Sequence, residues 1–184
     1  MQSSESGQRL AGAVVASHGP TSGAWVVRYL DAHAMILRSL TQQQVEAAPS
    51  EIWNAFVDLL AMEELASLTL EQRPAHHVFW YESEVQNGGH LQYFENRGTR
   101  HLAATVAALG LLGATCQQQV LREAGAMWLS RSRSLVGTAQ EFCDTALAGE
   151  FNAFDSRFHE CSPSLQQCLA AYLEQHQALF VTVT

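Results

Sequence analysis

Histidines, cysteines and carboxylates are the side chains that could do chemistry here, and the sequence holds 8 histidines, 4 cysteines and 18 acidic residues. A metal site is the first chemistry to consider, because His76 and Glu84 lie two turns apart on one predicted helix face. Two turns span about 12 Å, which is too far for both side chains to bind one ion without ligands from another element. The metalloprotease pattern HExxH and the di-iron pattern Glu-x-x-His are both absent from the sequence. We therefore expect neither a metal nor a cofactor.

Catalytic signatures are equally scarce. The hydrolase pattern GxSxG does not occur, and the glycine-containing segment Gly110–Gly113 lacks the lysine and serine of a phosphate-binding loop. Glu82 and Glu84 are two residues apart, so they point to different faces of a helix and cannot easily act as a carboxylate pair. No catalytic residue is predicted, and the sequence favours a protein that is not an enzyme.

The four cysteines are Cys116, Cys143, Cys161 and Cys168. They form no CxxC pair of the kind found in zinc ribbons and thioredoxin-type proteins. The N-terminal residues do not have the basic start and long apolar run of a signal peptide. No stretch approaches the roughly 18 apolar residues of a membrane span. These features predict a cytoplasmic protein with reduced thiols and without membrane association.

Negative charge is concentrated in the middle of the chain. The formal net charge is −8, and residues 46–95 alone hold nine acids and one arginine. This excess argues against direct binding of nucleic acid, because phosphate binding requires a basic surface. A concentrated acidic field can steer a basic partner, although ordinary solvated helix faces would give the same pattern.

The spacing of apolar residues predicts helices and almost no strands. Residues 1–24 read as a mobile tail, Trp25–Leu40 as a helix and Thr41–Pro49 as a polar linker. Residues 1–45 are therefore predicted to be an N-terminal extension, and residues 46–184 a single helical domain.

Capping patterns mark the starts of the other predicted helices. The predicted caps are Ser50, Thr69 with Gln72, Thr99, Thr115 with Gln118, Thr138 with Glu141, and Ser162 before Pro163. The helix after Thr69 carries Pro74 in its first turns, where a missing N–H costs least near the first helical position. Its start is therefore expected either after Thr69 or closer to Arg73, and its end at Asn87-Gly88. An aromatic helical turn is expected at Phe151–Phe158, and only Phe180–Thr184 looks like a strand. The predicted fold is an all-α bundle of about seven helices with short connections.

The stretch Trp80–Arg100, WYESEVQNGGHLQYFENRGTR, is the most informative part of the sequence. Each glycine inside a regular element costs roughly 0.5–1 kcal/mol, so Gly88 and Gly89 are expected to form a turn that requires positive φ or close backbone approach. A short helix from His90 to about Asn96 should follow and end at Gly98.

Aromatic and amide side chains flank this turn. The aromatic residues are Trp80, Tyr81, Tyr93 and Phe94. They are expected to pack the turn onto the core, and the alternative is a patch that binds a partner. The amides of Asn87, Gln92 and Asn96 are expected to bond carbonyls of the turn.

The segment YESEVQNGGHLQYFEN, at Tyr81–Asn96, resembles the signature E-V-x-N-G-G-x-x-Q-[FY]-F-x-N of a bacterial family. That family was formerly a domain of unknown function and is now named after a DNA-mimic protein. Phe151–Cys161 and Leu169–His176 are similar to later segments of the family, so the resemblance covers roughly Ser50–Phe180. It implies an all-helical fold and an acidic, dimeric protein that occupies the DNA-binding face of a transcription factor.

The resemblance implies a binding mode in which carboxylates spaced like phosphates engage arginines and lysines of a DNA-binding protein. The candidate partner-binding carboxylates are Glu63, Glu64, Glu71, Glu82, Glu84 and Glu95. Residues of the motif with a structural or ligand-binding role are Asn87, Gly88, Gly89, Gln92, Phe94 and Asn96. The predicted function is that of a non-enzymatic acidic interaction protein whose partner is a basic DNA-binding protein such as a transcription regulator.

Two alternatives stay open at this point. The first is an enzyme or small-ligand binder with a pocket beside the Asn87-Gly88-Gly89 turn, near His90, Tyr93 and Trp80. A deep polar pocket there, with carboxylates whose pKa values are shifted, would favour it. The second is a homodimer whose function is purely structural.

Overall fold

The structure is a computed structural model that describes residues 14–17, 26–29, 35–130 and 137–184 of the chain. This part contains eight α-helices, two 3-10 helices and four short strands. In chain order the elements are β1 (Val14–Ser17), β2 (Val26–Tyr29), β3 (Arg38–Leu40), α1 (Gln42–Ala47), α2 (Glu51–Met62), η1 (Leu65–Ser67), α3 (Arg73–Arg97), α4 (Leu102–Leu111), α5 (Thr115–Leu129), α6 (Ala139–Leu147), α7 (Asn152–Glu160), α8 (Leu165–His176), η2 (Gln177–Leu179) and β4 (Val181–Val183). The predicted all-α fold is confirmed, because the strands form only two small two-stranded sheets.

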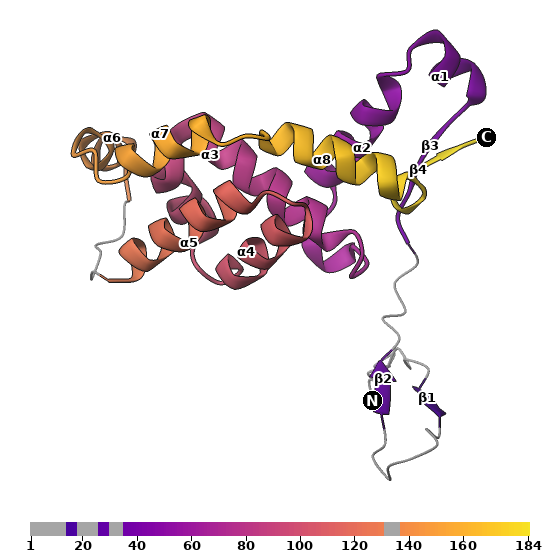
Figure 1. The fold of residues 1–184 in the computed structure, drawn as a ribbon, viewed down its shortest axis with the longest axis horizontal. Coiled ribbons are helices and arrows are strands. Elements are labelled where there is room, and N and C mark those ends of the chain that lie inside the picture. Colours follow the sequence, from indigo (N-terminus) through magenta and orange to yellow (C-terminus); the bar gives the residue numbers. More distant parts are fainter. Residues whose placement is uncertain (1–13, 18–25, 30–34, 131–136) are drawn as a thin grey trace, which may run out of the picture.

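Helix α3 is the centre of the bundle. It packs against α2, α4, α7 and α8, and α5 packs against both α4 and α7 (Figure 1). Tyr81 of α3 is fully buried, and its ring meets Tyr93 and Phe158 edge to face at centroid distances of 5.1 and 5.5 Å. These contacts join α3 to α7. α3 contributes more buried apolar residues to the core than any other element and positions the residues discussed below.

The end of the chain is a strand, as predicted, but it has an unexpected partner. β4 pairs in parallel with β3, and the backbone N–H of Arg38 donates to the carbonyl of Phe180 at 2.9 Å. Phe180 is fully buried and meets Phe56 of α2 edge to face. Arg38 also forms ion pairs with Asp58 and Glu63 at 2.6 and 3.0 Å. The boundary predicted at residue 45 stays a prediction, but residues before it contact the helical bundle.

Two predictions for the N-terminal region are wrong. Within the helix predicted over Trp25–Leu40, the described residues contain strands β2 and β3, and residues 30–34 lie outside the described residues. The linker Thr41–Pro49 contains helix α1. The valines of β2 favour a strand, and β3 forms because β4 is available to pair with it. α1 starts with a complete capping box between Thr41 and Gln44. The predicted tail contains β1, and residues 1–13 and 18–25 lie outside the described residues.

Only some of the predicted helix caps are confirmed. The box of Thr138 with Glu141 is confirmed at the start of α6. α5 instead begins after Ala114 without a side-chain cap, because the Gln118 amide donates to the carbonyl of Val106. α4 begins after His101 and α8 after Ser164, so the caps predicted at Thr99 and Ser162 are wrong. Ser50 does precede α2, but its side chain makes no capping hydrogen bond.

Gln72 carries only half of its predicted capping box. Its side-chain oxygen accepts from the backbone N–H of Thr69 at 3.1 Å, as expected. α3 begins at Arg73, the later of the two predicted starts. Its amide nitrogen donates to the carbonyls of Ile36 and Leu179, each at 2.7 Å. Gln72 is completely buried and therefore ties segments before β3 and before β4 to the start of α3.

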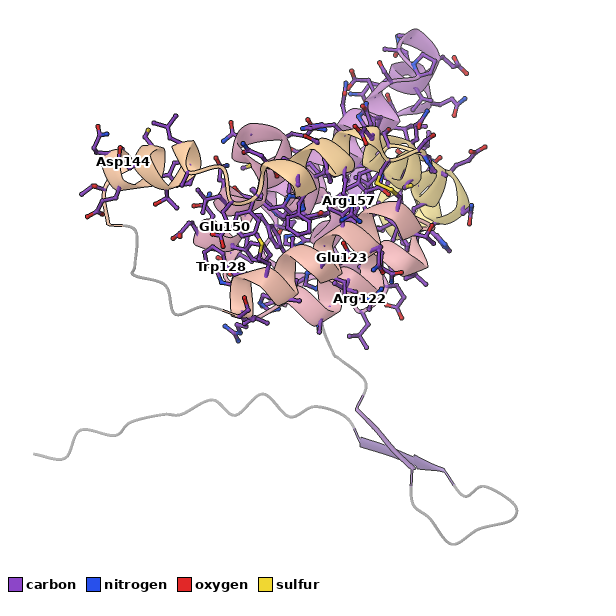
Figure 2. All side chains as sticks on the ribbon, turned by 60° about the vertical axis from the view of Figure 1, so that its left-hand side comes forward. Arg122, Glu123, Trp128, Asp144, Glu150 and Arg157 are labelled. Atoms are coloured by element: carbon purple, nitrogen blue, oxygen red, sulfur yellow. A yellow bond between two sulfur atoms is a disulfide. The ribbon has the colours of Figure 1, made fainter. Side chains whose placement is uncertain are left out.

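Two of the four cysteines form a disulfide, so the prediction of reduced thiols is wrong for them. Cys116 at the start of α5 is bonded to Cys161 at the end of α7. Cys143 and Cys168 are free. The bond adds a covalent link where α5 and α7 already pack and where the Arg157–Glu123 ion pair also joins them (Figure 2).

Replacing both bonded cysteines by serine (C116S/C161S) is expected to lower the free energy of unfolding by about 2 kcal/mol. The bond closes a loop between residues 45 positions apart, so its loss frees conformations of the unfolded chain. Urea unfolding of the wild type and the variant measures the difference. The matched control is Cys143→Ser, which changes an exposed free thiol. Equal stability of the double variant and this control would contradict the prediction.

Candidate functional site

The Gly-Gly pair divides α3 into two helical halves. The backbone is non-helical only at Gly88 (φ −156°, ψ 27°) and Gly89 (φ 72°, ψ −174°). The first half therefore ends at Asn87-Gly88 and the second begins at His90, and Gly98 with φ 59° ends it. The predicted turn, its positive φ and the following short helix are confirmed.

Asp155 of α7 occupies the space beside Gly89. A Cβ atom on Gly89 would lie 2.6 Å from Asp155 Oδ2, so close approach as well as positive φ requires glycine there. Asp155 Oδ1 accepts a hydrogen bond from the backbone N–H of His90 at 2.8 Å and another from its Nδ1 at 2.6 Å. The carboxylate thus caps the second half of α3, where the helix dipole favours negative charge.

His90 continues this chain of hydrogen bonds into the core. Because Nδ1 donates to Asp155, Nε2 is left to accept from the Tyr81 hydroxyl at 2.9 Å. Burial raises the pKa of Tyr81 well above its ordinary value. The side chains of Tyr81 and His90 have no exposed surface, so no substrate can reach them. Tyr81, His90 and Asp155 therefore form a structural network, although their types would suit catalysis.

Glu84 joins the two halves of α3 by a second network. Its Oε2 accepts from the amides of Gln92 at 2.9 Å and Asn96 at 2.8 Å, and its Oε1 accepts from Arg97 Nε at 2.9 Å. Burial alone would raise the pKa of Glu84, but these three hydrogen bonds outweigh it and hold the pKa below its ordinary value. The prediction that these amides bond turn carbonyls is wrong for Gln92 and Asn96, and Asn87 donates to the Gln92 side chain.

The aromatic residues of the motif pack the turn onto the core, as expected. Tyr93 and Phe94 are buried, and Phe94 stacks on Trp128 of α5 at a centroid distance of 4.9 Å. Trp80 is half-buried, and the Arg97 guanidinium lies 3.8 Å from the centroid of its ring. Arg97 is consequently held from two sides, by the Glu84 carboxylate and by the Trp80 ring.

The six candidate carboxylates lie in very different surroundings. Glu84 is buried and Glu63 is paired with Arg38. Glu82 is half-buried, and burial raises its pKa. Glu95 is half-buried and takes part in interactions within the chain. Only Glu64 and Glu71, in the connection between α2 and α3, are exposed. Binding of a partner by these residues stays a prediction, and the geometry favours the last two for it.

A pocket does lie beside the Gly-Gly turn. It has a volume of 280 Å³, and its lining includes Asn87, Gly88, Gly89, Asp155 and His159. The volume is at the lower limit for a small-molecule site. The wall combines a carboxylate, an amide and an imidazole, so this pocket is polar. It lies beside the turn, as the first alternative requires, but His90, Tyr93 and Trp80, the residues named for that alternative, do not line it.

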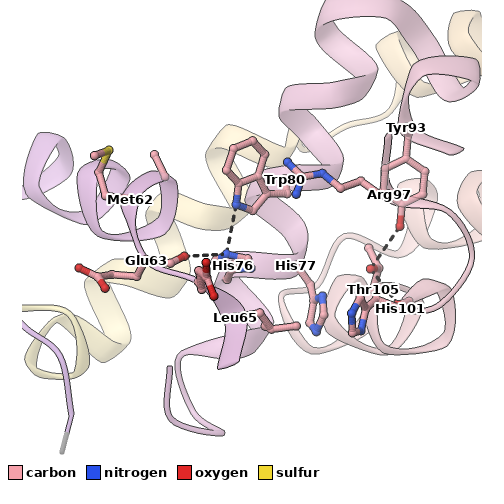
Figure 3. Close-up of a pocket in the computed structure, with 12 residues that line it drawn as sticks. Met62, Glu63, Leu65, His76, His77, Trp80, Tyr93, Arg97, His101 and Thr105 are labelled. Atoms are coloured by element: carbon pink, nitrogen blue, oxygen red, sulfur yellow. Dashed lines mark hydrogen bonds between the residues drawn. The ribbon is translucent and has the colours of Figure 1, made fainter. Parts of the chain in front are cut away.

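A second pocket, which we call the histidine pocket, lies on another side of α3. It has a volume of 330 Å³ and is lined by Ala61, Met62, Glu63, Glu64, Leu65, His76, His77, Trp80, Tyr93, Arg97, His101 and Thr105. Figure 3 shows these residues converging from the end of α2, both halves of α3 and the start of α4. Tyr93 and Trp80, which are predicted to lie near a pocket, line this one. The grouping of His76, His77 and His101 was not predictable, because the third histidine comes from the start of α4.

His76 stays uncharged in this pocket at neutral pH. Its pKa is lowered to about 4, mainly by burial and secondly by electrostatic repulsion from the neighbouring His77. A neutral Nε2 can accept the hydrogen bond that the Trp80 indole donates at 3.1 Å. Burial also lowers the pKa of His77, whose ring centroid is 5.6 Å from that of His101. His76 and His77 are therefore favoured as neutral hydrogen-bonding groups, and Arg97 is a cation in the pocket wall.

The low pKa of His76 makes the fold sensitive to acid. In the unfolded chain the pKa of a histidine is near 6.5. At any pH between that value and about 4, the unfolded state therefore holds the proton more tightly than the folded state does. The stabilisation is complete above about pH 6.5 and is lost as the pH falls towards 4. We expect urea unfolding at pH 5 to show about 2 kcal/mol less stability from this residue than at pH 7. The variant His76→Gln should show a correspondingly smaller pH effect, and an unchanged pH effect would contradict the prediction.

Comparison with known proteins assigns the family. The family profile described as DMP19-like protein matches residues 66–176, from the residues before α3 to the end of α8. The chain therefore belongs to the DMP19-like family, and the DNA-mimic family expected from the motif is confirmed. No curated protein and no solved structure matches the chain.

Two other kinds of site are absent from the described ranges. None of their helices has both the length and the apolar character needed to cross a bilayer. Within the same ranges, no three or more histidine, cysteine, aspartate and glutamate side chains converge closely enough to hold a metal ion.

Proposed function

We propose that this DMP19-like protein is a non-enzymatic interaction protein that docks onto a basic DNA-binding protein. The observation that carries the proposal is the exposed connection between α2 and α3. Glu64 and Glu71 are exposed there, close in sequence to Met62 and Leu70, whose exposed fractions are 72% and 60%. Large exposed apolar side chains beside charges are typical of a surface that binds another protein. We call these four residues the docking edge.

Electrostatics supports a basic partner for the docking edge. Residues 46–72 contain six acids and no arginine or lysine. Arg38, which lies outside this segment, pairs with two of those acids, Asp58 and Glu63. The segment itself holds no arginine or lysine to neutralise the other four acids. Exposed carboxylates are strong acceptors for the arginines and lysines with which a DNA-binding protein holds phosphates. Family membership favours a DNA-binding protein as the source of those cations.

Affinity capture from a lysate of the cell that produces this protein tests the identity of the partner. The immobilised chain should retain a basic DNA-binding protein, and the double variant E64Q/E71Q should retain much less of it. The matched control E160Q/E174Q removes two exposed carboxylates on α7 and α8. A DNA duplex bound by the captured protein should then compete with the chain. Equal capture by both double variants, or binding that DNA does not affect, would overturn the proposal.

Salt dependence is the quantitative prediction for the purified pair. Raising the salt from about 50 to about 300 mM shortens the range of electrostatic attraction. We expect the affinity to fall by about ten-fold or more, and expect a smaller fall for E64Q/E71Q, which has fewer charges to screen. Isothermal titration calorimetry at several salt concentrations measures both effects. Affinity that is indifferent to salt would exclude docking through carboxylates.

Ligand binding is the second candidate function. The 280 Å³ polar pocket beside the Gly-Gly turn favours it, because that pocket lies where the first alternative requires one.

A further inference from the structure

We propose that the histidine pocket binds a small organic carboxylate with an apolar body. Its volume of 330 Å³ falls within the range of small-molecule sites. The pocket spans the break in α3 at Gly88-Gly89. His76, His77 and Trp80 come from the first half of α3, and Arg97 comes from the second. A ligand here would contact both halves of the kinked helix. The inference is independent of the proposed docking edge, except that the two share the residues at the end of α2.

Arg97 supplies the group that would bind the carboxylate. Its Nε atom donates to Glu84 and its guanidinium lies against the Trp80 ring at 3.8 Å. Neither contact uses the two Nη groups, and the side chain is 35% exposed where it lines the pocket. A guanidinium held in place in this way loses little entropy when it binds a carboxylate.

The other charged groups around the pocket favour a monoanion. Glu63 is paired with Arg38, and its side chain points away from Arg97 (Figure 3). Glu64 is exposed at the rim. Arg97 is already ion-paired with Glu84 through Nε. With that carboxylate behind it and another at the rim, the site can accommodate one further negative charge better than a doubly charged phosphate. His77, with its pKa lowered by burial, and His101 add imidazole rings whose N–H groups can donate further hydrogen bonds.

The remaining wall is apolar. Ala61, Met62 and Leu65 line the α2 side, opposite the aromatic rings of Trp80 and Tyr93. Met62 is flexible and 72% exposed, so it can move against the body of a ligand. Hydrophobic walls with few fixed polar groups are the usual composition of sites for small organic molecules.

Three probes test separately whether binding requires the carboxylate and whether it requires the apolar body. The probes are 1-naphthylacetate, its neutral analogue 2-(1-naphthyl)ethanol, and acetate. In ¹H–¹⁵N NMR spectra, 1-naphthylacetate should cause saturable shifts of the Trp80 indole N–H and the Arg97 Nε–H signals. The alcohol lacks the charge and acetate lacks the apolar body, so each should bind about ten-fold more weakly or worse. Absence of saturable shifts with 1-naphthylacetate, or equal binding of the alcohol, would overturn the proposal.

A matched pair of variants locates the binding. Ala61→Leu adds three carbon atoms at an exposed position of α2 that lines the pocket, and Asn54→Leu adds an apolar side chain at an exposed position of the same helix outside it. We expect A61L to weaken 1-naphthylacetate binding by about ten-fold or more, and N54L to bind like the wild type. Binding by A61L at wild-type affinity would overturn the proposal. The comparison of the three probes on the wild type decides the question even if A61L fails to fold.

Discussion

Replacing Gly89 by alanine should lower the free energy of unfolding by about 3–4 kcal/mol. Residues other than glycine seldom adopt φ 72° with ψ −174°, and such a conformation costs about 1–3 kcal/mol. The new Cβ would also lie 2.6 Å from Asp155 Oδ2. That carboxylate cannot move aside freely, because its other oxygen holds two hydrogen bonds from His90. Strain and collision act together, so the effect exceeds that of either alone.

Gly88→Ala is the matched control for this substitution. Gly88 has a negative φ of −156°, and a Cβ there would mainly meet the end of the flexible Gln92 side chain. We expect a loss of about 1–2 kcal/mol, since Gln92 can rotate at the cost of two hydrogen bonds, one to Glu84 and an exposed one from Asn87. Urea unfolding followed by circular dichroism compares the two variants. If G89A were as stable as G88A, the role assigned to the Gly89–Asp155 contact would be wrong.

Removing the carboxylate itself should have an effect of similar size. Asp155→Ala leaves two N–H groups of His90 without their acceptor, the backbone N–H and Nδ1–H. The His90 ring is completely buried, and unpaired buried donors cost about 1–3 kcal/mol each. We expect a total loss of about 3–4 kcal/mol, which also includes the lost helix cap. The milder variant Asp155→Asn keeps one side-chain oxygen as acceptor and should lose clearly less. Equal losses for D155A and D155N would contradict a hydrogen-bonding role.

The double variant G89A/D155A tests whether the two residues act on each other. Without the Asp155 carboxylate, the alanine Cβ has no oxygen to collide with, and only the backbone strain remains. The sum of the two single losses should therefore exceed the measured loss of the double variant by about 1 kcal/mol or more. Strictly additive losses would show that the collision contributes nothing.

The local features of α3 could be read from the sequence because they depend on neighbouring residues. Glycine pairs, a proline at a helix start and apolar spacing each indicate the backbone conformation of residues close to them in sequence. The turn at Gly88-Gly89 and the following helix were therefore predictable. The two networks around the turn were harder to predict. His90 and Asp155 are 65 positions apart, and nothing in the sequence says that α7 crosses α3 there. A signal did exist, since Asp155 interrupts the aromatic turn Phe151–Phe158, where a carboxylate needs a partner.

Glu84 shows how charge can mislead a prediction from sequence. A glutamate in an acidic segment looks like part of a solvated surface, but Gln92, Asn96 and Arg97 surround this one with donors. All three lie within 13 residues of it, yet only the kink turns them back towards Glu84. The net charge of residues 46–95 therefore overstates the negative charge available for docking. The histidine pocket was missed for a related reason, because it assembles from three helices.

The pairing of β3 with β4 has a practical consequence for shortened versions of this protein. A chain begun at residue 46 would lose Arg38, the strand that pairs with β4 and one acceptor of the Gln72 amide. β4 would then present unpaired N–H and C=O groups, which invite pairing with a second molecule. Self-association of such a truncated chain would be an artefact of where it was cut. Expression for crystallisation or interaction screening should therefore retain residue 36 and everything after it.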